Sequence, residues 1–368
     1  MMAGLFACLS TAALSGCGGS DPDTPTPTTA AQAAGDLVRT NQYPGALAVR
    51  VTSASIEVNV AGIARIGGEA VSASGRFPIG SLSKSMTATL AGILVQEGGL
   101  RWDTRLLDVL PELRVIAQTD YSGVTLRDLL AHRSGVIALT HAEQIAQVPP
   151  LVGSPREQRL QFTAWALTLT PATKPGAQVE YSNGGYLAAA AMLERAAGDA
   201  YESLVQARLF APLGIAATFG AAGAQDGEPW GHITTDGKHW TPLDPTDAAA
   251  LLPAAANPAG GVKMNGAELG RYLQLHLRAL RGEPGLLIDP ATARVLHTVV
   301  QDLFALGWAA RFDSHGNSLS WHEGSDDTSY LAEMAVIPAT DTAGLVVINA
   351  FGPATFADAN RALLSLLP

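Results

Sequence analysis

Ser81-Leu82-Ser83-Lys84 is the stretch that decides the fold. It follows Phe77-Pro78-Ile79-Gly80, which is typical of a strand end and a turn, and precedes apolar residues at helical spacing that stop at Gly98-Gly99. Residues i and i+3 share one face of a helix, so Lys84 can reach Ser81. A serine hydroxyl becomes nucleophilic beside a base, and a lysine whose charge is destabilised by burial can serve as one. Alone, the pattern also fits a serine N-cap with a solvated lysine.

Two further motifs occur downstream of this helix. Tyr181-Ser182-Asn183 precedes a helix expected to run from residue 187 to its stop at Gly198, and it offers a phenol and an amide two residues apart. His322-Glu323-Gly324 closes an expected strand, and its glycine lets a second backbone or a substrate approach. Each motif also has a purely structural interpretation, as a capping loop or a strand-end histidine.

Composition places the chain among globular enzymes and excludes several classes. With 368 residues, 47% of them hydrophobic, the chain can bury a large core. A formal net charge of −10 and a pI near 5.2 argue against nucleic-acid binding. The seven histidines other than His322 show no H-x-H or H-E-x-x-H spacing, so we expect no metal site and no cofactor. No G-x-S-x-G elbow and no phosphate-binding loop occurs.

The N-terminal residues indicate export. Residues 1–16 are largely apolar and end in small residues directly before Cys17, as in a bacterial lipoprotein signal peptide, although the basic start of such signals is missing. An unmodified apolar leader is the alternative. Residues 17–32 are rich in proline and threonine and predict an extended tether. We therefore expect a body of residues 33–368 in the bacterial cell envelope, facing the periplasm and held to the membrane through lipidated Cys17.

The order of expected elements predicts an α/β fold of the α+β type. Short β-rich runs occupy residues 47–51 and 56–63 near the start, and 303–312, 319–322, 330–337 and 344–350 near the end, before a helix over 353–367. Helical patterns dominate the region between, for example over 266–280. This arrangement predicts an antiparallel sheet built from both termini, with flanking helices and an inserted, mainly helical region.

The three motifs, in this order and at these separations, resemble those of the serine β-lactamase and penicillin-binding protein superfamily. The second motif is Y-x-N, so the chain is most similar to the class C-like branch, which includes class C β-lactamases, D-alanyl-D-alanine carboxypeptidases and family VIII esterases. The segments at residues 61–64, 125–135 and 258–261 also match. The resemblance covers about residues 44 to 352 and implies a β-lactamase/transpeptidase-like fold.

The resemblance also implies a role for each site residue. Ser81 would attack an acyl carbon and form an acyl-enzyme, while Lys84 and Tyr181 share the base role and then the acid role. Asn183 would bind an oxygen of the substrate and hold Lys84. The backbone N–H groups of Ser81 and Ser325 would form the oxyanion hole. His322 and Gly324 would contribute to substrate binding, with His322 at the place of the K-T-G lysine.

That histidine is the main departure from the family pattern. His322 should be largely neutral at pH 7, whereas Glu323 should be negative, with Asp326 and Asp327 close behind it. Strand alternation leaves open whether Glu323 faces the cleft. We therefore rank hydrolysis of esters or amides first. The alternatives are a D-alanyl-D-alanine carboxypeptidase, a class C β-lactamase, or a penicillin-binding sensor without turnover, and the sequence leaves the oligomeric state open.

Overall fold

The computed structural model describes residues 27–368 except 226, 248–252 and 314. The expected leader, Cys17 and most of the tether lie outside these residues. The strands are β1 (Gly45–Val51), β2 (Ile56–Gly62), β3 (Phe77–Pro78), β4 (Thr218–Phe219), β5 (His232–Ile233), β6 (Thr241–Pro242), β7 (Val262–Met264), β8 (Ala309–Phe312), β9 (Ser318–Ser325), β10 (Leu331–Ile337) and β11 (Thr342–Ile348). The helices are α1 (Ala30–Arg39), α2 (Ser83–Gln96), α3 (Leu106–Val109), α4 (Leu126–Leu130), α5 (Ala142–Ile145), α6 (Pro155–Ala166), α7 (Asn183–Ala197), α8 (Tyr201–Val205), α9 (Asn257–Gly260), α10 (Gly266–Leu280), α11 (Pro290–His297) and α12 (Thr355–Leu366).

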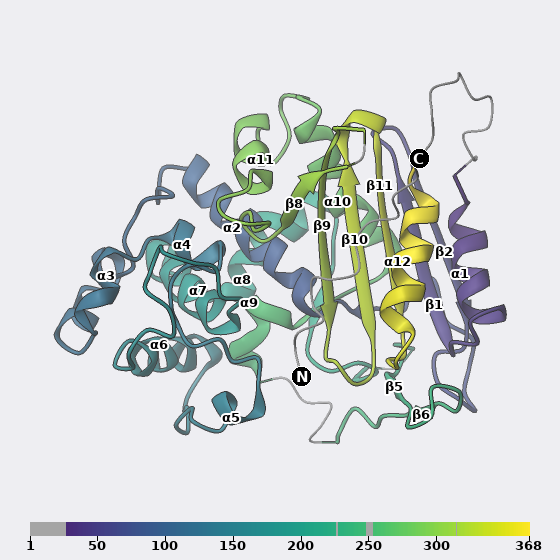
Figure 1. The fold of residues 1–368 in the computed structure, drawn as a ribbon, viewed down its shortest axis with the longest axis horizontal. Helices are drawn as coiled ribbons and strands as arrows, with labels where there is room; N and C mark the ends of the chain where they lie inside the picture. The colour runs from purple at the N-terminus through teal and green to yellow at the C-terminus, as the bar shows by residue number, and fades with distance from the viewer. Residues whose placement is uncertain (1–26, 226, 248–252, 314) are drawn as a thin grey trace.

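A six-stranded sheet forms one half of the molecule, in the order β2-β1-β11-β10-β9-β8. Its strand pairs are antiparallel, and β1 from the N-terminal part pairs with β11 from the C-terminal part. Helices α1 and α12 pack together on one face, and α10 covers the other (Figure 1). The predicted α/β fold, with a sheet built from both termini, is confirmed.

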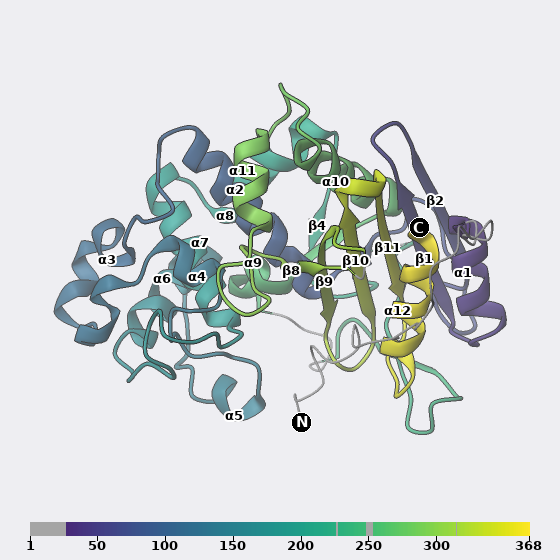
Figure 2. The ribbon, with the colours of Figure 1, turned by 45° about the horizontal axis from the view of Figure 1, so that its top comes forward.

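The inserted helical region forms the second half. Helices α3 to α7 lie to one side of the sheet, and α2 runs between the two halves in both views (Figures 1 and 2). Twelve of the fourteen residues of α2 are buried, from Ser83 to Leu94, which is typical of a helix that is enclosed on all sides. The hydroxyls of Ser85, Thr87 and Thr89 are each satisfied by hydrogen bonds, so this polar helix face tolerates burial.

Local sequence sets the helix ends. Asn265 caps α10 and Ser154 caps α6, each within a reciprocal capping box. Gly198, with φ of 80°, ends α7 in the left-handed conformation that favours glycine. These signals explain why both ends of α10 and the C-terminal end of α7 fall where the sequence predicts them. Helix α7 begins at Asn183, four residues before the expected residue 187, because Ser182 caps it there.

Several predicted boundaries shift. Helix α1 begins at Ala30, three residues before the expected start of the body, because Thr29 and Gln32 form a capping box there. Only Ala309–Phe312 of the expected strand over 303–312 pairs with β9. The strand over 319–322 extends instead to Ser325, because residues 320–325 pair with β10. The whole H-x-G motif therefore lies within the last residues of β9.

Candidate functional site

Ser81 and Lys84 meet at the start of α2. A short 3-10 turn (Gly80–Leu82) leads directly into the helix, and Lys84 Nζ donates hydrogen bonds to Ser81 Oγ at 2.9 Å and to Ala259 O at 2.7 Å. The Lys84 side chain is fully buried, and burial lowers its pKa well below the usual value. A neutral amine beside the hydroxyl can accept its proton, so the pair has the chemistry of a base and a nucleophile.

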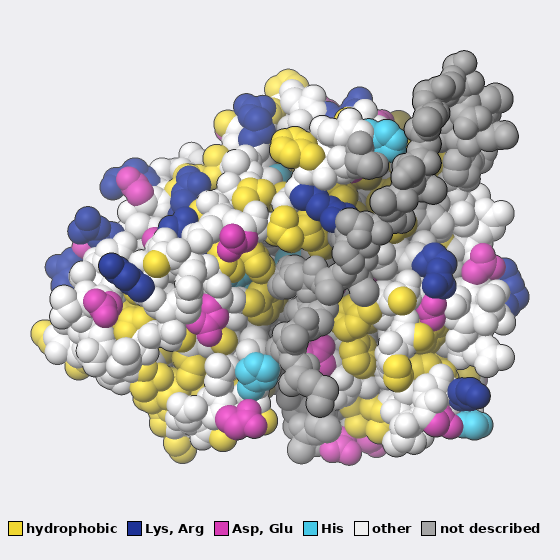
Figure 3. All heavy atoms as spheres, in the orientation of Figure 1, with side chains coloured by type: hydrophobic (Ala, Val, Ile, Leu, Met, Phe, Trp, Pro, Cys, Tyr) yellow, Lys and Arg dark blue, Asp and Glu magenta, His cyan; other side chains and the backbone are white. Residues whose placement is uncertain are grey.

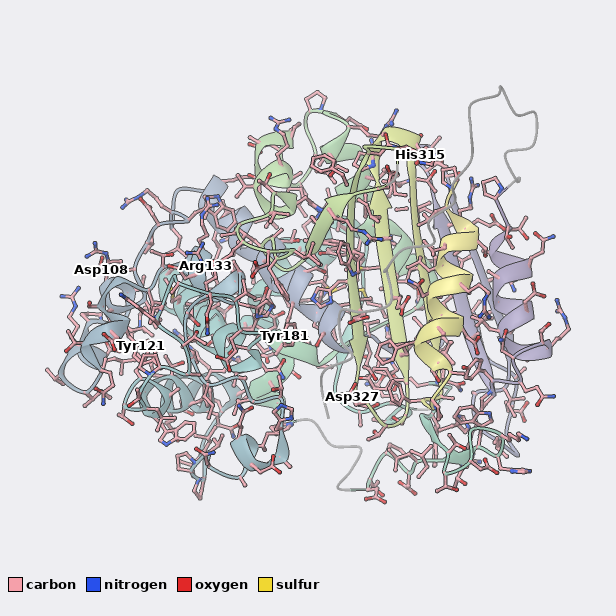
Figure 4. All side chains as sticks on the ribbon, in the orientation of Figure 1. Asp108, Tyr121, Arg133, Tyr181, His315 and Asp327 are labelled. Atoms are coloured by element: carbon pink, nitrogen blue, oxygen red, sulfur yellow. The ribbon has the colours of Figure 1, made fainter. Side chains whose placement is uncertain are left out.

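Tyr181 completes this group. Its hydroxyl shares a hydrogen bond with Ser81, and Lys84 Nζ lies 4.8 Å from the centroid of its ring. Burial raises the pKa of Tyr181, the hydrogen bond with Ser81 lowers it, and the charges of Glu323 and Asp327 raise it. The phenol is therefore protonated at neutral pH and suited to donate a proton. Figure 4 shows Tyr181 between the helical half and the sheet.

His132 supports Tyr181 from behind, a contact that the sequence did not predict. The two rings stack with centroids 4.3 Å apart, and His132 Nδ1 accepts a hydrogen bond from Ser182 N at 3.0 Å. Burial and the charge of Lys84 lower the pKa of His132, so its ring is neutral. The only sequence signal for His132 was its position in the segment 125–135, which resembles the corresponding segment of the β-lactamase and penicillin-binding protein superfamily.

Asn183 lies at the site, as expected of a substrate-binding residue, but without the expected contact to Lys84. It is the first residue of α7, whose N-cap is Ser182, and it lines the main cavity. Asn183 Nδ2 donates to Leu139 O at 2.9 Å. Among the described residues the partners of Lys84 Nζ are Ser81 and Ala259, so the expected contact between Asn183 and Lys84 is not formed. The Leu139 carbonyl accepts one of the two hydrogens of the Asn183 amide.

The two backbone N–H groups expected in the oxyanion hole lie where the 3-10 turn crosses β9. A Cβ at Gly324 would lie 2.7 Å from Ser81 N and 2.1 Å from Ile79 O, and a Cβ at Gly80 would lie 2.7 Å from Ser325 N. Gly80 also has φ of 51°. Only glycines allow this close approach, which brings the N–H groups of Ser81 and Ser325 to the same edge of the cavity.

His322 is placed away from the main cavity. It is buried and lines a small secondary cavity with His132, Tyr181 and Trp308. Its Nδ1 donates to Glu323 O at 2.6 Å, and burial together with the charge of Lys84 lowers its pKa to about 3. The expectation of a neutral histidine agrees with this low pKa. Direct substrate binding by His322 does not fit its position behind Tyr181.

Glu323 differs from the expected negative group. It lines the main cavity, and its register partner across the sheet is Glu333 of β10, so both side chains lie on the face that carries α12. Burial, then the charges of Glu333 and Asp327, raise the pKa of Glu323 to about 8. The carboxyl is therefore largely protonated at neutral pH.

The main cavity has a volume of about 480 Å³ and opens beside Ser81, Tyr181 and Asn183. One wall is apolar and includes Leu139, Ile145, Val148, Leu151, Phe162 and Leu187. Hydrophobic side chains also gather on the surface over the α5 region (Figure 3), where Ile145 and Val152 are exposed. The other wall carries the carboxyl groups of Glu323, Asp326 and Asp327, with Asp327 at the end of the β9–β10 hairpin (Figure 4).

The described part of the cavity lining carries no basic side chain and no cluster placed to bind a metal ion. Among the described residues that line it, none is Lys or Arg. Within the described ranges no group of three or more His, Cys, Asp or Glu side chains is placed to hold a metal ion. None of the helices in the described part of the chain is both long and apolar enough to cross a bilayer.

Comparison with known proteins identifies one family over nearly the whole chain. Residues 30–367 match the Beta-lactamase family. The chain is 27% identical over 350 residues to Penicillin-binding protein 4 of Amycolatopsis lactamdurans, covering 90% of this chain and 88% of that protein.

Two solved structures share the fold. A class C beta lactamase from Rhodobacter sphaeroides is 19% identical with a TM-score of 0.69, covering 90% of this chain and 97% of that one. D-alanine Carboxypeptidase AmpC from Burkholderia cenocepacia is 20% identical with a TM-score of 0.70, covering 90% and 95%. With the family matched over residues 30–367, the chain belongs to the Beta-lactamase family and is a serine hydrolase.

Proposed function

We propose that the protein hydrolyses uncharged esters or amides through an acyl-enzyme on Ser81. The observation that carries this proposal is the buried contact of 2.9 Å between Lys84 Nζ and Ser81 Oγ at a cavity of about 480 Å³. The described lining of that cavity contains no Lys or Arg that could bind a substrate anion, and its three carboxyl groups repel an anion once they are ionised.

The geometry supports a division of labour between the two proton-transfer groups. Neutral Lys84 takes the proton of Ser81 as Oγ attacks the acyl carbon, and the N–H groups of Ser81 and Ser325 stabilise the oxyanion. Tyr181, whose pKa is raised, gives its proton to the leaving oxygen or nitrogen and regains one from Lys84. Water then attacks the acyl-enzyme, and Ser81 is released with its hydroxyl restored.

A second candidate is a D-alanyl-D-alanine carboxypeptidase. The similarity over 90% of the chain to Penicillin-binding protein 4 supports it in so far as that name indicates a site that accepts penicillin, an anionic acyl donor. So does the raised pKa of Glu323, since a protonated carboxyl repels a substrate carboxylate less than a charged one does. A class C β-lactamase and a sensor without turnover remain outcomes of the test below.

The test compares three substrate classes with purified protein. We expect higher kcat/KM for short neutral esters than for a chromogenic cephalosporin or a D-Ala-D-Ala peptide. Ser81→Ala should remove both hydrolysis and labelling by a fluorophosphonate, with an unchanged circular dichroism spectrum. Turnover that persists in Ser81→Ala would refute the nucleophile. Labelling of the wild type without turnover would support the sensor instead.

We further propose that the protein acts in the bacterial cell envelope. Only the sequence of residues 1–32 supports this location, through the apolar leader, Cys17 and the proline-rich tether. A lipid anchor at Cys17 would hold the hydrolase at the membrane surface and expose it to periplasmic substrates.

A further inference from the structure

Lys263 and Glu228 form an ion pair sealed inside the protein next to the cavity. Lys263 Nζ donates to Glu228 Oε2 at 2.6 Å and to Ala221 O at 3.1 Å. The side chain of Lys263 is 0% exposed and that of Glu228 is 4% exposed. Taking two such charges out of water is costly, so a pair of this kind adds little net stability to a fold.

One end of the pair belongs to the framework that leads into Ser81. Lys263 lies in the middle of β7, where it is the register partner of Pro78 in β3 and of Thr218 in β4. Strand β3 runs into the 3-10 turn that carries Ser81. The backbone at Lys263 is therefore fixed relative to the nucleophile by strand pairing on both sides.

The other end holds one wall of the cavity. We define the wall segment as residues 220–225 and 227–231, of which Gly220, Ala221, Ala222 and Gly231 line the cavity. The Lys263 ammonium contacts this segment twice, at the Ala221 carbonyl and at the Glu228 carboxylate. Glu228 Oε2 also accepts from Gln225 N at 3.2 Å, so the same carboxylate closes a turn within the segment.

Backbone hydrogen bonds hold the wall segment near its two ends. Gly220 N donates to Gly261 O at 3.0 Å, just before β7. Trp230 N donates to Ala64 O at 2.9 Å, and Gly231 O accepts from Leu243 N at 2.8 Å. Beyond the far end, His232 N donates to Ser329 O at 3.0 Å, in the turn that follows Ser325. Between these ends the two bonds of Lys263 are its polar links to β7. Removing them should leave the ends attached and release the middle.

We propose that Lys263 and Glu228 are a positioning pair that fixes the wall segment relative to Ser81 and thereby determines how tightly substrate binds. The inference rests on the proposed function, because it concerns the same cavity. Neither Lys263 nor Glu228 lines the cavity. The pair therefore acts through Ala221 and Ala222, which do line it. Its loss should weaken substrate binding more than it slows the chemical step.

The test replaces both charges at once with side chains of similar size. The double variant Lys263→Met/Glu228→Gln leaves no buried charge, so it should fold, whereas Lys263→Met alone strands a buried carboxylate and should destabilise the protein. The matched control is Arg208→Met/Glu97→Gln, which removes an exposed ion pair of 2.6 Å. Circular dichroism and thermal unfolding establish that both double variants are folded.

Two readouts decide the outcome. Amide hydrogen exchange in peptides of the wall segment should become about ten-fold faster in the double variant and remain unchanged in the control. For a neutral ester, KM should rise about ten-fold while kcat stays within about three-fold. Unchanged exchange in the wall segment, or a fall in kcat at constant KM, would overturn the inference. If the wild type turns over no ester, hydrogen exchange still decides the positioning role separately from the proposed function.

Discussion

Raising the pH should lower kcat/KM for anionic substrates, because Glu323 becomes negatively charged. The wild-type carboxyl, with its pKa raised to about 8, is protonated at pH 6 and ionised at pH 9. The charges of Glu333 and Asp327 raise the pKa of Glu323. A charge on Glu323 raises the pKa of Tyr181. Glu323→Gln should mimic the protonated form at every pH.

The magnitude follows from Coulomb's law. The charge of Glu323 acts on Tyr181, so a substrate carboxylate bound in the same cavity lies within its electrostatic reach. Two like charges about 8 Å apart, at an effective dielectric constant of about 20–40, repel by about 1–2 kcal/mol. This energy corresponds to about a five- to thirty-fold loss of kcat/KM for an anionic substrate.

The assay is the ratio of kcat/KM for a neutral ester to that for a cephalosporin, measured at pH 6 and pH 9. Taking the ratio cancels the titration of Lys84, which both substrates share. The ratio should rise five- to thirty-fold in the wild type and stay constant in Glu323→Gln. An equal rise in both proteins would refute the reasoning.

The remaining predictions concern chemistry, anchoring and stability. Lys84→Ala and Tyr181→Phe should each lower kcat/KM for a neutral ester by about 10²-fold or more, and a loss below about ten-fold would exclude that residue from proton transfer. Cys17→Ala should move the protein from the membrane fraction to the soluble periplasmic fraction, whereas an unmodified mature N-terminus by mass spectrometry would contradict lipidation. Burial raises the pKa of Glu333 from 4.5 to about 8, so the folded state binds the proton more tightly and wild-type stability should fall as the pH rises through this range. Glu333→Gln should therefore withstand more urea than the wild type at pH 9 but not at pH 5, and an equal difference at both values would contradict the raised pKa.

The sequence predicted the parts of the fold that depend on local pattern. The apolar spacing after Ser81, the glycine stop of α7 and the β-rich runs near the C-terminus each lie within a few residues, and the structure places elements at these positions. Strand boundaries were predicted less well. The extension of β9 to Ser325 depends on pairing with β10, which the segment over 318–325 does not encode by itself.

The sequence by itself predicted the contact between Ser81 and Lys84, because residues three apart at the start of a helix share one face. Only the tertiary structure decided the state of the groups around it. Ala259 O holds Lys84, His132 stacks on Tyr181, and Glu323 is protonated at neutral pH through contacts with segments far away in the chain. Proton affinity depends on burial and neighbouring charge, and both are set by how distant segments pack.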